Sequence, residues 1–377
     1  VEMRPIEVLT HPTIRTELEW LATAARRPLS DRAVSSETDA IVATQRQLDI
    51  YLASRLATEP STYNMPWAVR ISGPLAVDSL SDALRQLAKH HPSLRTTFHL
   101  EGERLLRRLQ PVDSVLVEVL DQRGHDAAVG QLAESLVRPF DLAAEAPFRA
   151  AIVQLAENEH LLFWDLHHIA ADGWSMEPLL RDLESAYVAR SEGRDPRLSQ
   201  PALQYHDWAR AAAAADPALL AERTTWWEHR LGSLPEEVTF PPDRARGKAS
   251  GRGAGQVRTE IDAATQRGLT TLAGRAGVSS FVVLHGLFAA LLNLHGAGDD
   301  IVVGTVTAGR DSSALEDVVG FFVNTVVLRS DLSGDPTFEG LLARLKLSDA
   351  DSLAHADVAF DSVVERLNPD RSGSRHP

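Results

Sequence analysis

The chain has 377 residues, enough for about two domains with sizeable cores. Its net charge of −14, with 24% charged and 44% hydrophobic residues, is typical of a globular protein and argues against nucleic-acid or anionic-membrane partners. The sequence contains no cysteine, no apolar run long enough to span a bilayer and no signal peptide at Val1, so we expect a cytoplasmic protein without disulfides.

The first 37 residues are predicted to lie outside the main fold. Residues 1–28 contain apolar residues at helical spacing, with Thr13 as a candidate N-cap. A helix this short needs a surface to dock on. Residues 29–37 are mostly polar and predict a linker.

Residues 38–190 are predicted to form an α/β lobe. Helices are expected from Ile41 to Tyr51 and, with a clear apolar face, from Leu75 to His90. Two apolar runs, Phe148–Leu155 and Leu161–Leu166, are separated by a short polar stretch and predict a β-hairpin.

The hairpin leads into a stretch rich in polar groups, His167-His168-Ile169-Ala170-Ala171-Asp172-Gly173. A helical pattern follows, so we expect a strand-loop-helix junction, a place where rigid elements hold functional groups. A histidine is a natural general base near neutral pH. If the strand continued, alternation would place His168 on one face and His167 on the other, so only one imidazole would enter a given cavity.

Three interpretations of this stretch remain open. In the first, His168 is the base, and Asp172-Gly173 forms a tight turn in which the Gly173 N–H approaches a substrate oxygen. In the second, the histidines are structural. In the third, the His-x-x-x-Asp spacing belongs to a metal site. Because the sequence has no cysteine and no second His/Asp/Glu cluster with metal-ligand spacing, no metal is predicted.

Residues 191–377 are predicted to form a second lobe. Phe281–Leu294 is apolar nearly all round, so we expect a buried helix that contains a hydrogen-bonded core histidine, His285. Two later segments predict strands, and Asn324 lies in the second of them. An asparagine in so apolar a strand costs stability unless it is hydrogen-bonded, so Asn324 is expected to fix the backbone or to line a cavity.

The motif His167–Gly173 resembles the HHxxxDG signature of the condensation domains of nonribosomal peptide synthetases, relatives of chloramphenicol acetyltransferase. Further stretches resemble other motifs of this family in the family's order, over about residues 38–377. They are His90–Phe98 (similar to R-H-E-x-L-R-T-x-F), Pro139–Leu142, Gln204–Ala209, Val319–Thr325 (similar to V-G-x-F-V-N-T) and His355–Asp361. His90 and His91 are interpreted as a helix end rather than as ligands.

The resemblance implies an α/β fold of two chloramphenicol-acetyltransferase-like lobes, a V-shaped pseudo-dimer with a central tunnel. Residues 38–190 would be the N-lobe and residues 191–377 the C-lobe, with the C-terminal end of the C-lobe missing. Residues 1–28 resemble the end of a peptidyl carrier protein. The expected partners are an upstream donor carrier, a downstream acceptor carrier and an adenylation domain, and the only cofactor implied is the phosphopantetheine arm of the carriers.

The implied reaction is peptide bond formation, in which an acceptor amine attacks a donor thioester. His168 would position the amine and accept its proton, and the Gly173 N–H would stabilise the oxyanion. Asp172 is expected to be structural and to pair with an arginine. Arg310 is the first candidate for this partner by resemblance, and Arg95 is the second.

His167 and Asn324 are also assigned structural roles at the site. Trp174 and the Phe-Phe-Val-Asn-Thr strand look more like condensation domains that accept a donor ending in a D-residue. An epimerisation or ester-forming relative and a non-catalytic recruitment module are the alternatives. Epimerisation should need a further acid/base pair, and a recruitment module should lack the second histidine or the glycine.

Overall fold

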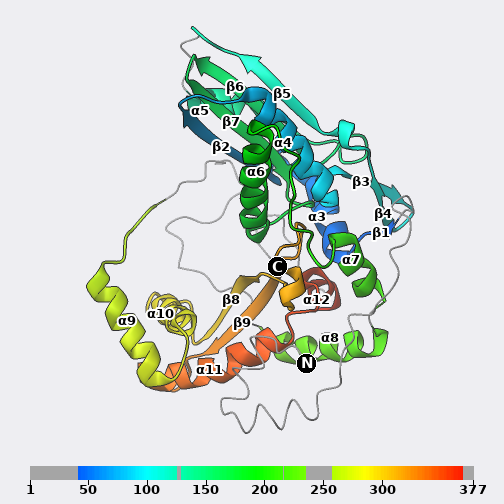
Figure 1. Cartoon of the computed structure of the whole chain (residues 1–377). Coiled ribbons are helices and arrows are strands. Elements are labelled where there is room, and N and C mark those ends of the chain that lie inside the picture. Colours follow the sequence, from blue (N-terminus) through cyan, green and yellow to red (C-terminus); the bar gives the residue numbers. More distant parts are fainter. Residues whose placement is uncertain (1–40, 125–128, 215, 235–256, 368–377) are drawn as a thin grey trace.

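The computed structural model describes the chain in four stretches, residues 41–124, 129–214, 216–234 and 257–367. They form two lobes, which lie one above the other in Figure 1. The predicted helix in residues 1–28 and the linker 29–37 lie outside the described residues.

The larger sheet of the N-lobe has the strand order β2-β7-β6-β5. Its strands are β2 (Asn64–Ser72), β5 (Leu116–Asp121), β6 (Phe148–Ala156) and β7 (Glu159–His167). β7 pairs antiparallel with both β2 and β6, whereas β5 runs parallel to β6. The predicted hairpin is therefore confirmed as β6–β7.

Helices cover both faces of this sheet, which explains why β6 and β7 are apolar almost throughout. The covering helices are α4 (Val77–His90), α5 (Val129–Leu136) and α6 (Met176–Ser191). Ile152, Leu162 and Trp164 pack with α4 and α6 on one face. Leu161 and Phe163 pack with α5 on the other.

A smaller sheet, of order β1-β4-β3, completes the N-lobe beside helix α3. Its elements are β1 (Ile41–Val42), β3 (Thr96–Glu101), β4 (Arg104–Leu109) and α3 (Gln45–Leu56), with 3₁₀ turns η1 (Pro92–Arg95) and η2 (Val112–Ser114). The helix predicted from Ile41 begins four residues later. Thr44 caps it, and its side chain accepts a hydrogen bond from the Gln47 N–H.

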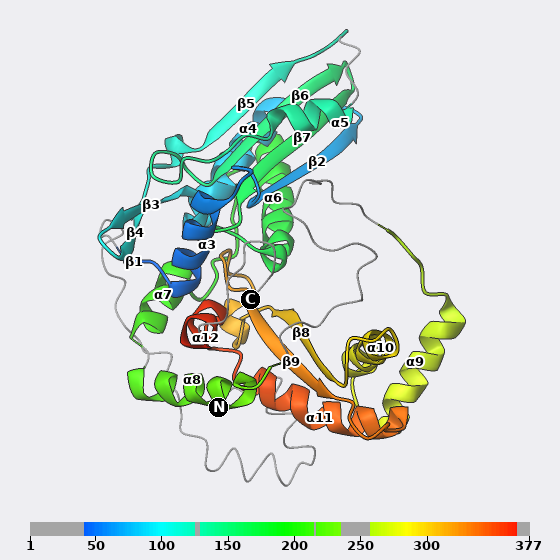
Figure 2. The same ribbon diagram turned by 180° about the vertical axis from the view of Figure 1, so that it is seen from behind.

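The described part of the C-lobe is an antiparallel pair of strands with helices around it, except that α7 lies against β1 and η1 of the N-lobe (Figure 2). The strands are β8 (Asp300–Thr307) and β9 (Asn324–Asp331). The helices are α7 (Tyr205–Ala213), α8 (Pro217–Leu231), α9 (Ala263–Ala276), α10 (Ser280–Leu294), α11 (Phe338–Ala354) and α12 (Phe360–Leu367), with the 3₁₀ turn η4 (Ser313–Leu315).

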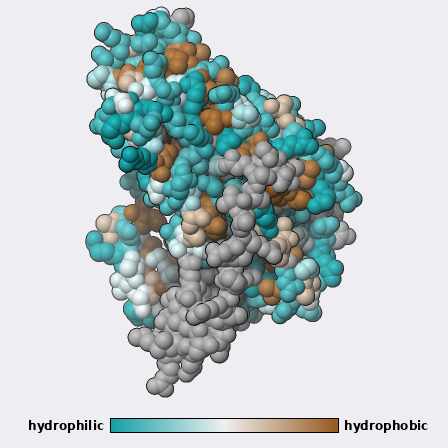
Figure 3. Space-filling view, turned by 45° about the vertical axis from the view of Figure 1, so that its right-hand side comes forward, coloured by the Kyte–Doolittle hydropathy of each residue, from teal (hydrophilic) through white to brown (hydrophobic). Residues whose placement is uncertain are grey.

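Helix α10 is present as predicted, but the prediction that it is buried all round is wrong. Val283 and Ala289 face the core, whereas Phe281, Leu284 and Phe288 are 43–47% exposed. The helix packs on α9, α11 and β8 from one side only. In Figure 3, hydrophobic residues border the notch between the upper and lower lobes. Composition could not distinguish a helix covered on one side from a fully buried one.

His285 on the buried face of α10 is confirmed as a hydrogen-bonded core histidine. Its Nδ1 lies 2.9 Å from Asp349 Oδ2, and its Nε2 lies 3.1 Å from Ser330 Oγ.

Within the described stretches, no single helix is long and apolar enough to cross a bilayer, and α9 with α10 reach that length only as a pair bent by 102°.

The lobes meet along residues 308–323, which join β8 to β9 and which we call the bridging strap. Ser93 Oγ donates to Val319 O at 2.8 Å, and Arg181 Nη1 donates to Asp317 Oδ1 at 2.6 Å. Both donors belong to the N-lobe. The strap therefore brings C-lobe backbone to the ends of α4 and α6.

We predict that Asp49→Asn stabilises the protein at alkaline pH. Burial, and next the nearby Asp361 on α12, raise the pKa of Asp49 on α3 to about 7. The folded state then binds more protons than the unfolded state between about pH 4 and pH 7, so stability falls as pH rises through this window. The Tm advantage of the variant should grow from pH 4 to pH 8, whereas the exposed Asp113→Asn should show no such trend. An advantage that does not change with pH would contradict the prediction.

Candidate active site

The predicted strand-loop-helix junction is confirmed. β7 ends at His167, the loop runs to Asp172, and the 3₁₀ turn η3 (Gly173–Ser175) leads directly into α6. Because the strand stops at His167, strand alternation does not govern the direction of His168.

Two contacts of the His168 ring and one of its backbone hold this residue, yet its side chain remains partly exposed. Its Nδ1 lies 2.9 Å from Ala171 O, and its backbone N–H donates to Tyr63 O at 2.9 Å. The ring meets Phe321 of the bridging strap edge to face, with centroids 5.1 Å apart. Because a carbonyl oxygen only accepts, Nδ1 is the donor in this contact, and in the neutral ring Nε2 is then the nitrogen with the lone pair.

His167 is buried and lies in a different environment. Its Nδ1 accepts a hydrogen bond from the Ile169 N–H at 3.1 Å, and its ring lies near Tyr63 and Phe140. Burial, and next the neighbouring His168, lower the pKa of His167 to about 4. This imidazole is therefore neutral near pH 7 and packs between aromatic rings.

Asp172 is fully buried, and its carboxylate accepts hydrogen bonds from both lobes. Arg310 donates from Nη1 to Oδ2 at 2.9 Å and from Nη2 to Oδ1 at 3.0 Å. The Phe322 N–H donates to Oδ2 at 3.0 Å, and Ser175 donates to Oδ1 from its N–H and from its hydroxyl, both at 3.0 Å. The loop is thereby tied to the C-lobe and to the start of α6.

The predicted ion pair between Asp172 and Arg310 is thus present, and the second candidate, Arg95, is wrong. Arg95 donates instead to the carbonyl oxygens of Ala88 and Gln110. Those carbonyls lie at the end of α4 and after β4. The acceptors for Arg95 are backbone carbonyl groups at the end of a helix and after a strand. Because they belong to the backbone, the side chains in the sequence around Arg95 do not reveal them.

Ser175 is a site residue that the sequence analysis missed. Its hydroxyl has one proton, for which Asp172 Oδ1 at 3.0 Å and Gly320 O at 3.1 Å are the two acceptors in reach, and it accepts from the Gly320 N–H at 3.2 Å. It therefore contacts the bridging strap as well as Asp172. The Asp172 and Ser175 side chains form a capping box around η3. The sequence feature that could have identified Ser175 is the capping pattern, in which Asp172 is followed three positions later by a second polar residue.

The turn predicted at Asp172-Gly173 is a 3₁₀ turn, in which Asp172 is the N-cap and Gly173 is the first residue of η3. The φ of Gly173 lies outside the positive range. Its N–H finds no acceptor within the described residues. It stands at the N-terminal end of η3 and α6, where free N–H groups and the helix dipole favour negative charge. An added Cβ would meet no atom within 4 Å, so the space in front of Gly173 is open.

Asn324 at the start of β9 fixes backbone, one of the two roles predicted for it. Its Nδ2 donates to Ala356 O at 2.8 Å and to Val358 O at 2.6 Å, and its Oδ1 accepts from the Phe360 N–H at 3.1 Å. All three partners lie before or at the start of α12. Asn324 therefore joins β9 to α12.

We predict that Asp172→Asn lowers the free energy of unfolding by about 3–5 kcal/mol, because it leaves the buried Arg310 cation without its anion. Urea denaturation of the chain would measure the loss. Glu101→Gln is the matched control, because Glu101 pairs with Arg108 at 2.7 Å on the exposed surface, and its removal should cost little. Equal losses in the two variants would contradict the prediction.

The family model described as Condensation domain matches residues 37–377. A probable non-canonical nonribosomal peptide synthetase, CymA of Salinispora arenicola, is 42% identical over 337 residues. That match covers 87% of this chain but only 4% of CymA.

Two solved structures have the same fold. The X-domain of teicoplanin biosynthesis, in a complex with OxyB, matches with a TM-score of 0.83 and 33% identity, over 94% of this chain and 78% of that chain. The first condensation domain of the CDA synthetase matches with a TM-score of 0.69 and 22% identity, over 88% and 78%. The expected α/β fold of chloramphenicol-acetyltransferase-like lobes is confirmed, and the chain belongs to the condensation domain family.

Proposed function

We propose that this chain forms peptide bonds within a nonribosomal peptide synthetase. The acceptor α-amine of one carrier-bound aminoacyl group attacks the thioester of a donor carrier. The observation that carries the proposal is the placement of His168, a partly exposed imidazole whose Nδ1 lies 2.9 Å from Ala171 O and whose Nε2 has no hydrogen-bond partner among the described residues. A basic nitrogen in this state can accept a proton from an attacking amine.

The partners proposed are an upstream donor carrier, a downstream acceptor carrier and an adenylation domain. The phosphopantetheine arms of the carriers would bring both reacting groups to one site, which supplies much of the entropic advantage of the reaction. The nonribosomal peptide synthetase CymA among the relatives supports this setting.

The proposed site residues have two roles: one accepts the proton of the attacking amine, and the other stabilises the oxyanion that forms on the thioester. Nε2 of His168 positions the acceptor amine and takes its proton as the C–N bond forms. The thioester oxygen becomes negative in the tetrahedral intermediate. The Gly173 N–H at the start of η3 has no acceptor among the described residues, and the space around the Gly173 Cα is open, so this N–H is the donor proposed for that oxygen. One such donor contributes roughly 3 kcal/mol to transition-state stabilisation. Asp172 and Arg310 hold the loop.

A recruitment module is the second candidate function. The likeness to an X-domain that was solved in a complex with OxyB favours it. In that case the site would bind a partner protein without transferring an acyl group. Retention of both His168 and Gly173 in an ordered loop favours the condensation reaction over recruitment.

We predict that His168→Ala slows peptide transfer by about 10²–10⁴-fold, because the variant loses the group that accepts the proton. Donor and acceptor carriers would be loaded separately and mixed with the domain in a single-turnover experiment. Intact mass of the acceptor carrier would report the product, with L- and D-terminated donors both tried.

The control for this experiment is His229→Ala, which removes an exposed histidine from α8 and should leave the transfer rate unchanged. No transfer by the parent chain with either donor, while both carriers still bind, would favour the recruitment module. Transfer that is unaffected by His168→Ala would remove His168 from the mechanism.

Gly173→Ala should slow transfer by about 10-fold or more and leave Tm unchanged. The new methyl group meets no protein atom, but it lies beside the N–H that would bind the oxyanion. Gly268→Ala on α9 is the matched control, since its Cβ also enters open space. A fall in Tm for Gly173→Ala, or an unchanged transfer rate, would contradict this role.

A further inference from the structure

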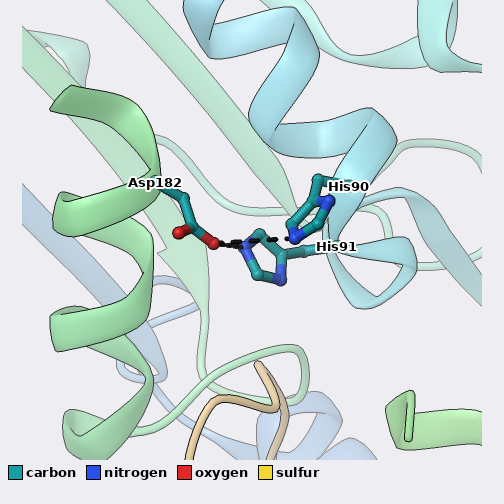
Figure 4. Close-up of side chains that lie close together, drawn as sticks. All are labelled: His90, His91 and Asp182. Atoms are coloured by element: carbon teal, nitrogen blue, oxygen red, sulfur yellow. Dashed lines mark hydrogen bonds and ion pairs between the residues drawn. The ribbon is translucent and has the colours of Figure 1, made fainter. Parts of the chain in front are cut away.

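Three potential metal ligands converge where helix α4 ends against helix α6. His90 and His91 close α4, and Asp182 reaches them from α6 (Figure 4). His91 Nε2 lies 2.9 Å from Asp182 Oδ2, and His90 Nε2 lies 3.7 Å from the same oxygen. The three residues are 8%, 1% and 3% exposed, so the group is shielded from solvent.

The expectation that no further His/Asp/Glu cluster has metal-ligand spacing is corrected by the fold. Asp182 lies 91 residues after His91, and only the packing of α4 on α6 brings them together. No spacing rule applied to the sequence connects positions so far apart.

We propose that His90, His91 and Asp182 bind a Zn²⁺ ion. Two imidazoles and a carboxylate form a ligand set that zinc commonly uses. Tetrahedral ligands at about 2.0–2.1 Å from zinc lie about 3.3 Å apart. The two distances from Asp182 Oδ2 to the imidazole nitrogens bracket this value, so small side-chain movements would complete the geometry.

The surroundings supply outer contacts to two of the three ligands, Asp182 and His90, whereas His91 Nδ1 is buried without a hydrogen-bond partner among the described residues. Asp182 Oδ1, the oxygen not used, accepts a hydrogen bond from Arg181 Nε at 3.1 Å. His90 Nδ1, the nitrogen not used, lies 3.3 Å from the Gln200 amide. Ser199 O lies 3.1 Å from His90 Nε2. Partners of this kind orient the ligating groups.

The competing state is a hydrogen-bonded cluster without metal. In that state His91 Nε2–H donates to Asp182 and His90 Nε2–H donates to Ser199 O. Zinc would displace both protons, so its binding should weaken as pH falls and protons compete for the imidazole nitrogens. Burial lowers the pKa of His90, which favours the neutral ligand.

His90 is one of two positions at which this chain departs from the family motif R-H-E-x-L-R-T-x-F, where the motif has arginine; the other is Pro92, where it has glutamate. An arginine beside Asp182 would be a permanent cation with no lone pair to offer a metal. His90→Arg therefore keeps a partner for Asp182 while it abolishes the site. A His90→Arg variant that loses zinc but still folds would show that the loss of zinc is not caused by unfolding.

Through Ser199 and Gln200, the zinc site would join α4 and α6 to the segment between α6 and α7, which leads from the N-lobe into the C-lobe. Arg181 extends the connection, because it also donates to Asp317 of the bridging strap. The ion would thus stabilise the end of α4 and the junction of the two lobes. This role does not depend on peptide transfer.

The test measures zinc bound by the whole chain. After EDTA treatment and desalting, the chain would be given equimolar Zn²⁺ and desalted again, and zinc would be counted by elemental mass spectrometry. Co²⁺ in place of zinc would report the geometry by visible absorption. The parent chain and the His229→Ala control should each retain about one zinc ion, with a tetrahedral cobalt spectrum.

The His90→Arg variant should lose the ion and the cobalt spectrum while it keeps a cooperative unfolding transition. Zinc should also raise the Tm of the parent chain and leave that of His90→Arg unchanged. A parent chain that retains no zinc, or equal zinc in the parent and in His90→Arg, would overturn the proposal.

Discussion

The buried carboxylate of Asp172 is the contact on which the arrangement of the site depends. It lies in the N-lobe, yet three of its five donors come from Arg310 and Phe322 of the C-lobe. A buried charge is tolerated only when it is paired and hydrogen-bonded. The loop of the HHxxxDG motif therefore reaches its conformation only when the two lobes are together.

The orientation of His168 follows from this constraint. The same strap that satisfies Asp172 carries Phe321, whose ring packs against the imidazole. The Tyr205 hydroxyl donates to Phe321 O at 2.8 Å and holds that part of the strap. One lobe thus supplies the candidate catalytic groups, and the other fixes their direction. Such placement on supported elements is what positioning for catalysis requires.

The sequence predicted those features that depend on local pattern. The β6–β7 hairpin, the helix after the motif and the hydrogen-bonded Asn324 all follow from periodicity or from the cost of an unpaired polar group. The features that it missed depend on packing between distant segments. Arg95 found backbone acceptors at the ends of neighbouring elements, α10 is covered on one side only, and Asp182 meets His90 and His91 across 91 residues. The Asp172–Arg310 pair was predicted by resemblance rather than by spacing.

The most direct test of this account is a double-mutant cycle on peptide transfer. Single-turnover rates would be measured for the parent chain, Asp172→Asn, Arg310→Gln and the double variant. If the pair acts as one unit that orders the loop, the double variant should be no slower than the slower single variant. Losses that multiply, so that each residue acts independently, would contradict the account.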